Sequence, residues 1–462
     1  MALESSKLVS EPSEQIKTRW RRIVTPIPAP DSIADIEKLR AMEPVSMQGM
    51  PPIQWHEAEG FLVRDAYGNQ WIDLSSGIVA ANAGHSHPHI AEAIRQAADR
   101  KLLFSYTFPT EVRRKLLTKL VDLAPFEDAK AIVFSAGTEV TECAMMLMRR
   151  HGCRISPSKC GILSFEAGYH GRTLAASLAG GVSKSTDWIK REQVHHFQIP
   201  FPFCPRCPWG RKDYQQCGQW CFNKCLDSLA QRNVKPRQIA GIIAESMPGW
   251  ATWPLPKDFA KSMEDWAREN DILITFDEIQ SGCGRTGKFF AFEHFGVEPD
   301  LITLGKGLTS SLPVSALIGR KEIMDQPEPG DMSSTHGGNP ICAAAAIANL
   351  EVIEHENLVS ASAKTGKLVL GRLQALQREF PDYFYSIHGC GLFISAHLKR
   401  PHDGQPDIKL ADAIVHQAVR RGVMMFPTAR GFFKFVPPLS IYPDAALEAV
   451  DVIRECFREK SL

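Results

Sequence analysis

Short apolar runs alternate with amphipathic stretches through the middle of the chain. The runs are four to six residues long and rich in Val and Ile, as in strands buried on both faces. Between them, apolar residues recur at the three- and four-residue spacing of helices that pack on a sheet. This alternation predicts an α/β domain with a mostly parallel sheet. The predicted buried strands are 131–134, 160–165, 239–244, 272–276 and 301–304, with a further strand, 314–320, at the edge of the sheet.

The two ends of the chain follow a different pattern. The first 50 or so residues are mostly polar at the start and then contain several prolines. This pattern predicts an N-terminal arm with one short helix at 32–42. Helical and strand-like segments alternate again near the C-terminus. We therefore expect the N- and C-terminal segments to form a smaller α+β domain. The predicted division is 1–78 for the arm and part of this small domain, 79–345 for the large domain, and 346–462 for the rest of the small domain.

Composition narrows the class of protein. The 462 residues are 44% hydrophobic and 23% charged, which is ordinary for a globular protein, and the net charge of +1 argues against nucleic acid as a partner. No apolar run is long enough to cross a bilayer, so no membrane partner is expected. The start lacks the apolar core of a secretory signal, and the twelve cysteines then suggest reduced thiols. We expect a cytoplasmic protein.

An acid and a lysine follow two of the predicted strands. The strand 272–276 runs into Asp277, and the strand 301–304 is followed by Lys306 between two glycines. Ligands of open α/β sheets bind outside the carboxyl ends of the strands. Such a pair suits pyridoxal phosphate, because the lysine forms a Schiff base and the acid keeps the pyridine nitrogen protonated. The alternative is a buried ion pair with an ordinary surface lysine.

Two further strand ends carry groups that suit this cofactor. A strand, a Gly137 turn and a helix bring free N–H groups and the hydroxyl of Thr138 to one spot, where a phosphate could bind. The alternative is a plain helix cap made by Ser135 or Thr138. After the strand 160–165, Tyr169 or His170 could stack on a planar ring, and Arg172 could hold a carboxylate.

In chain order, the motifs GHSHP, FSAGTEVTE, YHGRT, FDEIQSGCGRTG, LGKGL, STHGGNP and GFFKFVPPL stand between about residue 45 and the end. In this combination the sequence resembles the class III pyridoxal-phosphate aminotransferases. The resemblance implies the PLP-dependent transferase fold type I: a large domain with a mostly parallel seven-stranded sheet, and a smaller α+β domain. It also implies a ping-pong transfer of an amino group from an amine donor to an aldehyde or ketone.

The resemblance implies a role for each matching residue. Lys306 would bind the cofactor and move the substrate proton, and Asp277 would bind the ring nitrogen. Thr335 would reach the phosphate in the neighbouring subunit, so the resemblance implies a homodimer with shared active sites. The other implied cofactor residues are Gly137 and Thr138 at the phosphate, Tyr169 on the ring face with His170 beside it, Gln280 near the ring hydroxyl, and Glu245 in the supporting network.

Two departures from the family pattern concern the substrate. Trp250 stands where many relatives have a glutamate that shields an arginine, and Lys434 stands at the position of that arginine. A lysine can still bind a carboxylate, but without the planar fork. Trp250 and Trp253 could instead form an aromatic wall for an amino sugar, as in aminoglycoside biosynthesis. Arg172 remains where relatives that act on ω-amino acids bind the distal carboxylate, and Arg430 is a nearby alternative cation.

A cysteine-rich insert spans 201–226. Its spacing, Cys204-x2-Cys207 and Cys217-x3-Cys221-x3-Cys225, is close to that of zinc ligands. A similar loop occurs in a subgroup of the family that includes some amino-acid epimerases. We favour a structural loop without a metal, and a metal site or a disulfide are the alternatives.

An aminotransferase is the leading functional hypothesis. Its nearest rival is an epimerase or racemase with the same fold and cofactor, in which the proton returns to Cα instead of the cofactor. That reaction needs a second acid, for which Tyr169 or a residue of the insert is a candidate. A 4-aminobutyrate-type aminotransferase is a further alternative. A non-catalytic binding protein would be expected to lack Lys306.

Overall fold

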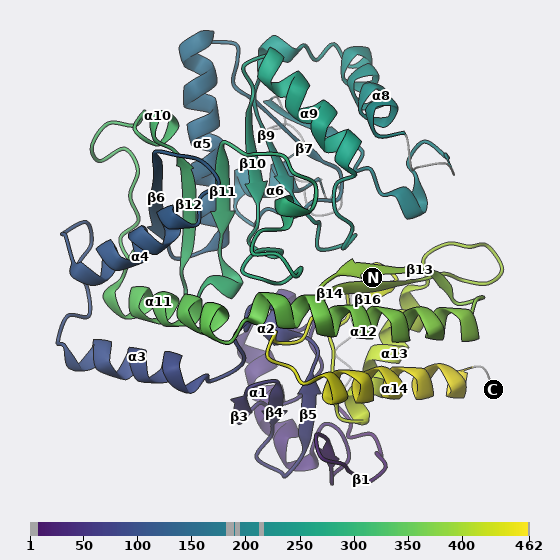
Figure 1. Ribbon diagram of the computed structural model, residues 1–462. Coiled ribbons are helices and arrows are strands. Elements are labelled where there is room, and N and C mark those ends of the chain that lie inside the picture. The colour runs from purple at the N-terminus through teal and green to yellow at the C-terminus, as the bar shows by residue number, and fades with distance from the viewer. Residues whose placement is uncertain (1–7, 182–188, 190–194, 212–216, 461–462) are drawn as a thin grey trace. The chain divides into compact units, whose positions relative to one another are not determined.

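The computed structural model describes residues 8–181, 189, 195–211 and 217–460 (Figure 1). The chain divides into two compact units, one formed by Met1–His87 with Ala361–Leu462 and the other by Pro88–Ser360. The sequence analysis set its boundaries after residues 78 and 345, so both observed boundaries lie further along the chain. No helix among the described residues has both the length and the apolar character needed to cross a membrane.

The Pro88–Ser360 unit is built on a seven-stranded sheet with the order β6-β12-β11-β10-β9-β7-β8 (Figure 1). The strands from β11 to β8 pair in parallel, whereas β12 pairs antiparallel with both β11 and β6. The predicted mostly parallel sheet is therefore confirmed. The strands are β6 (Ala129–Phe134), β7 (Gly161–Phe165), β8 (His196–Ile199), β9 (Ile239–Glu245), β10 (Leu273–Asp277), β11 (Leu301–Leu304) and β12 (Ser315–Arg320).

The predicted edge position of the strand 314–320 is wrong. This segment forms β12, which lies second from the edge, and β6 takes the edge itself. Burial explains the order, because all but the last residue of β12 are buried, whereas β6 has the exposed Lys130. An edge strand tolerates such a charge better than an inner strand does.

Helix α5 (Gly137–Ile155) packs closely on β9, and two glycines make this possible. A Cβ atom at Gly241 of β9 would stand 2.1 Å from the Met148 sulfur, and one at Gly152 of α5 would stand 2.7 Å from the Ala240 Cβ. Both distances are far below van der Waals contact, so a larger residue at either position would push α5 away from the sheet. Because α5 begins at the site described below, its packing also fixes the position of that site.

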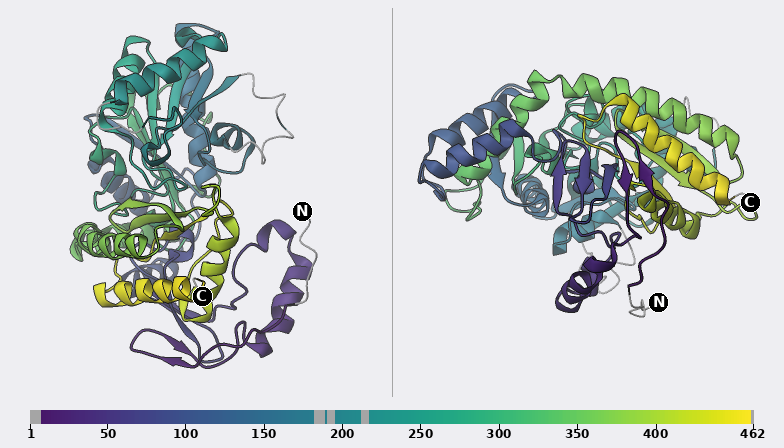
Figure 2. Two further views of the ribbon diagram at one scale, coloured as in Figure 1. Left: turned by 90° about the vertical axis from the view of Figure 1, so that its right-hand side faces the viewer. Right: turned by 90° about the horizontal axis from the view of Figure 1, so that it is seen from below.

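The remaining helices of this unit pack in two groups. α9 (Lys257–Glu269) contacts β10, and α8 (Gly218–Gln231) packs on α9, with the rings of Phe222 and Phe259 5.3 Å apart. α3 (Pro88–Asp99) and α4 (Glu111–Asp122) pack on α11 (Pro340–His355), and Figure 2 (right) shows these blue helices beside the green α11. The short helices are α6 (Leu174–Gly180) and α10 (Lys321–Met324).

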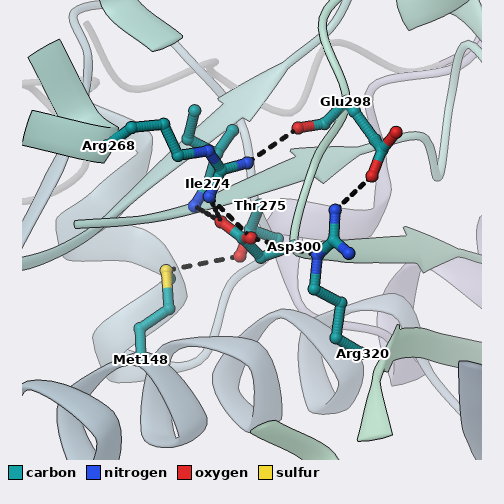
Figure 3. A network of polar contacts seen from close by, with 7 residues as sticks. All are labelled: Met148, Arg268, Ile274, Thr275, Glu298, Asp300 and Arg320. Atoms are coloured by element: carbon teal, nitrogen blue, oxygen red, sulfur yellow. Dashed lines mark hydrogen bonds and ion pairs between the residues drawn. The ribbon is translucent and has the colours of Figure 1, made fainter. Parts of the chain in front are cut away.

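A buried carboxylate joins the strands at the end opposite to the candidate site (Figure 3). Asp300, just before β11, accepts hydrogen bonds from the guanidinium of Arg268 at 2.7 Å and from the Ile274 N–H at 2.7 Å. Arg320 at the end of β12 lies 3.4 Å from the same carboxylate and pairs with Glu298. One acid thus ties α9, β10 and β12 together and fixes the relative positions of the strands that carry Asp277 and Lys306 at their far ends.

The described residues of the other unit form two smaller sheets and three long helices. One sheet has the order β1-β2-β5-β4-β3, with β15 paired in parallel to β5, and the other has the order β13-β14-β16. Trp71 of β5 is fully buried and donates its indole N–H to the Val419 carbonyl at 2.7 Å. The strands are β1 (Ile16–Lys17), β2 (Arg22–Ile23), β3 (Glu57–Glu59), β4 (Leu62–Arg64), β5 (Gln70–Asp73), β13 (Phe384–Cys390), β14 (Phe393–Leu398), β15 (Val423–Met424) and β16 (Phe432–Phe435), and the helices are α1 (Ile33–Met42), α2 (Ser76–Val79), α12 (Leu358–Glu379), α13 (Ile408–Arg420) and α14 (Pro443–Lys460).

Candidate active site

Three neighbouring strands of the large sheet carry polar groups at their carboxyl ends. Glu245 is the last residue of β9 and pairs in register with Asp277, the last residue of β10. Asp277 in turn lies beside Thr303 of β11, and Lys306 follows that strand. Parallel pairing in register therefore brings the two acids and the lysine together at the carboxyl ends of the strands, as the sequence pattern predicted for Asp277 and Lys306.

These groups surround a cavity of about 320 Å³. This volume lies at the lower end of the range for small-molecule sites. All of its lining residues belong to the Pro88–Ser360 unit. They are Gly137, Thr138, Tyr169, His170, Gly171, Arg172, Glu245, Asp277, Ile279, Gln280 and Lys306.

The Asp277 carboxylate is buried and held by hydrogen bonds to both oxygens. His170 Nδ1 lies 2.7 Å from Oδ2, while the Thr303 hydroxyl and the Ile279 N–H donate to Oδ1, each at 3.1 Å. These bonds fix the orientation of the carboxylate. His170 also lines the cavity, and its predicted position beside a ring face stays a prediction.

Burial and neighbouring charges shift the pKa values of His170 and Glu245. Burial alone would lower the pKa of His170, but the hydrogen bond and charge of Asp277, together with the charge of Glu245, outweigh it and raise the pKa above its usual value. The raised pKa favours the protonated imidazole beside Asp277. Burial raises the pKa of Glu245, although its oxygens accept the N–H groups of Tyr169 at 2.8 Å and Gly249 at 3.0 Å.

Lys306 stands on a strained turn. Its φ is +41°, a left-handed conformation that non-glycine residues seldom adopt, and it begins the short 3-10 helix η8 (Lys306–Leu308). Gly305 is extended, and a Cβ atom there would approach the Ile279 side chain to 3.3 Å. Burial lowers the pKa of the Lys306 amine, while Asp277 and Glu245 partly offset this effect. A lowered pKa increases the unprotonated fraction, which is the nucleophilic form.

The N-terminus of α5 points at the cavity through Gly137 and Thr138. Ala136 is the N-cap residue, and the Glu139 carboxylate accepts the N–H groups of Ser135 at 2.9 Å and Ala136 at 2.7 Å. Neither Ser135 nor Thr138 caps the helix by its hydroxyl, so the alternative of a plain side-chain cap is wrong. The N–H groups of the first helical positions have no intrahelical partner, which makes this turn suitable for a phosphate.

The Thr138 hydroxyl belongs to a chain of hydrogen bonds. Thr173 Oγ1 lies 2.5 Å from Thr138 Oγ1 and donates its proton to the Glu142 carboxylate. Glu142 also accepts the Ala175 N–H at 3.1 Å at the start of α6. Because the Thr173 proton goes to a charged acceptor, Thr138 must donate to Thr173. A phosphate bound at Thr138 would therefore accept the hydrogen bond that the Thr138 hydroxyl otherwise donates to Thr173.

The residues of the cavity fit pyridoxal phosphate. The helix N-terminus at Gly137 can bind the phosphate, buried Asp277 can bind the ring nitrogen, and Lys306 lines the same space. Tyr169 is 42% exposed and offers its ring to the cavity. Ile279 also lines it and packs near Gly137, where a Cβ atom would stand 3.1 Å away. Ile279 was not predicted from the sequence because an aliphatic side chain carries no reactive or charged group. Its position after the Asp-Glu pair was the signal.

Four of the predicted site residues do not line this cavity. Thr335 is exposed on the loop before α11. Trp250 packs against Phe203 with a ring distance of 5.3 Å. Lys434 and Arg430 belong to the other compact unit, where the Lys434 amine lies 5.7 Å from the Phe393 ring centre. The role of Thr335 at the phosphate of a neighbouring subunit, and the roles of Trp250, Lys434 and Arg430 in substrate binding, stay predictions.

Known proteins with similar sequences span nearly the whole chain. The chain is 32% identical over 412 residues to an alanine/serine racemase of Pyrococcus horikoshii, covering 87% of this chain and 84% of the relative. It is 31% identical over 413 residues to a probable 4-aminobutyrate aminotransferase of Bacillus subtilis, covering 87% and 92%. It is 32% identical over 424 residues to an acetylornithine aminotransferase of Methanothermobacter thermautotrophicus, covering 92% and 97%.

Solved structures and the family model agree with these relatives. A Bacillus anthracis aminotransferase superimposes with a TM-score of 0.82 at 25% identity, covering 92% of this chain and 99% of that one. The family model described as "Aminotransferase class-III" matches residues 45–457. The chain therefore belongs to the class III aminotransferases, which are enzymes of PLP fold type I that depend on pyridoxal phosphate.

Proposed function

We propose that this enzyme transfers the amino group of an ω-amino acid, in which a carboxylate and an amino group stand at opposite ends of a short chain. Arg172 is the observation that carries the proposal. It lines the same cavity as Lys306, is exposed, and lies over the Tyr169 ring at 5.6 Å. A guanidinium there can bind the distal carboxylate through two hydrogen bonds while the amino group points toward Lys306. The name of the Bacillus subtilis relative agrees with this substrate class.

Each residue of the cavity has its own proposed role in the reaction. Lys306 would hold the cofactor, and its amine would move a proton from the substrate carbon that bears the amino group to C4′ of the cofactor. The cofactor, when bound, accepts the electrons that this deprotonation releases. Asp277 keeps the ring nitrogen protonated through a charge-assisted hydrogen bond, and His170 and Thr303 hold Asp277 in place. Gly137 and Thr138 bind the phosphate, Tyr169 covers the ring, and Gln280 and Glu245 complete the surroundings.

An amino-sugar substrate is a less well supported candidate. It relied on Trp250 and Trp253 as an aromatic wall for the sugar. Trp250 packs between Phe201 at 5.9 Å and Phe203 at 5.3 Å, and Trp253 lies 6.4 Å from Phe203. Neither tryptophan is among the residues that line the cavity. This packing gives both rings a role within the fold and favours the smaller substrate.

Racemisation is the second candidate function. It would use Lys306 on one side of the substrate and Tyr169, which lines the same cavity, as an acid on the other. The alanine/serine racemase among the relatives gives this candidate weight. The two reactions differ in the fate of the amino group, because transamination leaves it on the cofactor and racemisation returns it to the substrate.

We also propose a homodimer with shared sites. The segment before α4 exposes Leu103 (58%), Phe104 (49%) and Phe108 (73%). It contacts the loop that carries Thr335, since the Tyr106 hydroxyl donates to Ser333 at 3.1 Å. An exposed apolar segment beside a residue expected to reach a neighbouring subunit suits an interface. Light scattering of the purified protein tests the dimer. The cytoplasmic location likewise stays a prediction.

One experiment separates the candidate functions. The holoenzyme is mixed with 4-aminobutyrate, an amino sugar or L-alanine in deuterated water, while the absorption spectrum and the deuterium at Cα are followed. We expect 4-aminobutyrate to convert the cofactor to its amino form. Conversion by the amino sugar alone, or deuterium entry into alanine without loss of its amine, would contradict the proposal.

A variant tests the proposed role of Arg172. Arg172→Gln should raise the KM for 4-aminobutyrate at least about tenfold, as expected for losing a charge-assisted pair worth roughly 1.5–3 kcal/mol. It should leave the KM for an uncharged alkylamine nearly unchanged. Arg95→Gln on exposed α3, which loses only an ion pair to Glu92, is the matched control. Equal losses for both substrates would contradict a carboxylate role for Arg172.

A further inference from the structure

The cysteine-rich insert forms a cluster of thiols beside α8. Cys204 begins the 3-10 helix η4 (Cys204–Arg206) and Cys207 caps its end, while Cys217 is the N-cap residue of α8. Cys221 and Cys225 follow on α8, and none of the five described cysteines is part of a disulfide. Four of them, all but Cys225, line one small cavity of about 10 Å³.

This cavity is not an assembled metal site. Across residues 8–181, 189, 195–211 and 217–460, no three His, Cys, Asp or Glu side chains are placed to hold a metal ion. A volume of about 10 Å³ is at the lower limit for one water molecule. Thiols that gather without a metal can still exchange with disulfides.

Two of the five thiols differ from the others in access and spacing. Cys204 and Cys207 are half-buried, whereas Cys217, Cys221 and Cys225 are buried on or at α8. Residues three apart in a 3-10 helix lie on one face, with Cα atoms about 6 Å apart for a rise of about 2 Å per residue. This separation is within the range that a disulfide spans. Pro205 between them restricts the turn in this conformation.

We propose that Cys204 and Cys207 form a reversible disulfide by exchange with a low-molecular-weight disulfide. The Cys207 thiolate attacks one sulfur of the small disulfide, whose S–S bond breaks and releases one thiol. The Cys204 thiol then gives its proton to water and attacks the Cys207 sulfur, which releases the second thiol. Two electrons pass from the protein to the small disulfide. Burial, with the neighbouring thiols, raises the pKa of Cys204 to about 12, which disfavours Cys204 as the first nucleophile.

The turn is coupled to the candidate active site through aromatic packing. Phe203 precedes Cys204, is buried, and lies 5.3 Å from Trp250. Gly249, next to Trp250, donates its N–H to Glu245 at 3.0 Å, and a Cβ atom on Gly249 would stand 2.3 Å from the Gln280 side-chain oxygen. A change in the turn therefore reaches two residues that line the cavity. This consequence, unlike the disulfide itself, rests on the proposed function.

Mass spectrometry tests the disulfide without any substrate. The reduced holoenzyme is incubated with oxidised glutathione, free thiols are blocked, and peptides are mapped. We expect a bond between Cys204 and Cys207, a glutathione adduct on Cys207 in Cys204→Ser, and no reaction of this turn in Cys207→Ser. Cys153→Ser, which alters an exposed cysteine on α5, should behave like the wild type. A bond between other cysteines of the cluster, or no bond in excess glutathione disulfide, would overturn the proposal.

Kinetics test the coupling separately. Oxidation should change the KM of the amine donor at least twofold in the wild type and leave Cys207→Ser unchanged. Reduction with dithiothreitol should restore the starting value. A bond that forms without any effect on KM would refute the coupling, and an inactive enzyme that still forms the bond would count against the proposed function only.

Discussion

His170 Nδ1 lies 2.7 Å from Asp277 Oδ2, and both side chains are buried at the carboxyl end of the large sheet. The contact sets the charge at the point where the cofactor nitrogen is expected. The Asp277 carboxylate has the His170 ring on one oxygen and hydroxyl and N–H donors on the other. A carboxylate that is held in this way can pair with a protonated ring nitrogen without reorienting.

The pH dependence of stability should report this pair. The pKa of His170 is raised in the folded protein, so its contribution is fully present below about pH 6.5, the ordinary value for histidine, and is lost as pH rises through the raised pKa. His170→Asn keeps a donor but no charge. It should cost about 1.5–3 kcal/mol at low pH and flatten this part of the profile. Denaturant unfolding of the apoprotein at several pH values measures both effects.

A matched variant shows whether the effect is specific. His56→Asn alters an exposed histidine of the other compact unit and should leave the profile as in the wild type. If His170→Asn retains the full loss of stability between acidic and alkaline pH, the protonated pair with Asp277 is not the cause.

Gly171 should be essential because it leaves room for Thr138 at the expected phosphate site. Its φ is +133°, and a Cβ atom there would stand 2.3 Å from the Thr138 hydroxyl oxygen. Gly171→Ala should displace Thr138 and weaken cofactor binding at least about tenfold, which corresponds to about 1.4 kcal/mol. Titration of the apoenzyme with pyridoxal phosphate, followed by fluorescence, measures this change.

Gly296 supplies the control for backbone strain alone. Its φ is +74°, but nothing lies within 4 Å of a Cβ atom built there. Gly296→Ala should lower stability by about 1 kcal/mol through strain and leave cofactor affinity unchanged. Similar losses of cofactor affinity in both variants would show that the contact between Gly171 and Thr138 is unimportant.

The Asp300 network should contribute to stability without affecting the chemistry directly. Asp300→Ala leaves the Arg268 guanidinium and the Ile274 N–H without their acceptor (Figure 3). The expected cost is about 1–3 kcal/mol, because the buried Ile274 N–H loses its acceptor whereas the Arg268 side chain is 40% exposed and can bind water instead. Asp265→Ala, which breaks an exposed pair with Lys261, should cost less than about 1 kcal/mol. Equal unfolding midpoints for the two variants would contradict this role for Asp300.

The buried strands were predictable because each is an apolar run with little else to explain it. β9, β10 and β11 all begin or end within one residue of the predicted ranges. The place of β12 was not predictable in this way, since strand order depends on pairing between distant segments. β8 was missed because its four residues, which include His196 and Gln198, do not form an apolar run.

The candidate site shows the same division. Asp277, Lys306 and Gly137 follow from local patterns, because a strand end or a helix start decides where each one lies. The contact between His170 and Asp277 joins residues 107 positions apart, and no local pattern indicates it. The chain from Thr138 through Thr173 to Glu142 likewise requires two segments to meet in space.

The central claim is that Lys306 binds pyridoxal phosphate in the cavity that Asp277 and Gly137 also line. Reduction of the holoenzyme with borohydride, followed by peptide mapping, tests it most directly. The account predicts a reduced cofactor fixed to the peptide that contains Lys306, and loss of the cofactor's visible absorption band in Lys306→Ala. A cofactor fixed to another lysine, or an unchanged spectrum in Lys306→Ala, would contradict it.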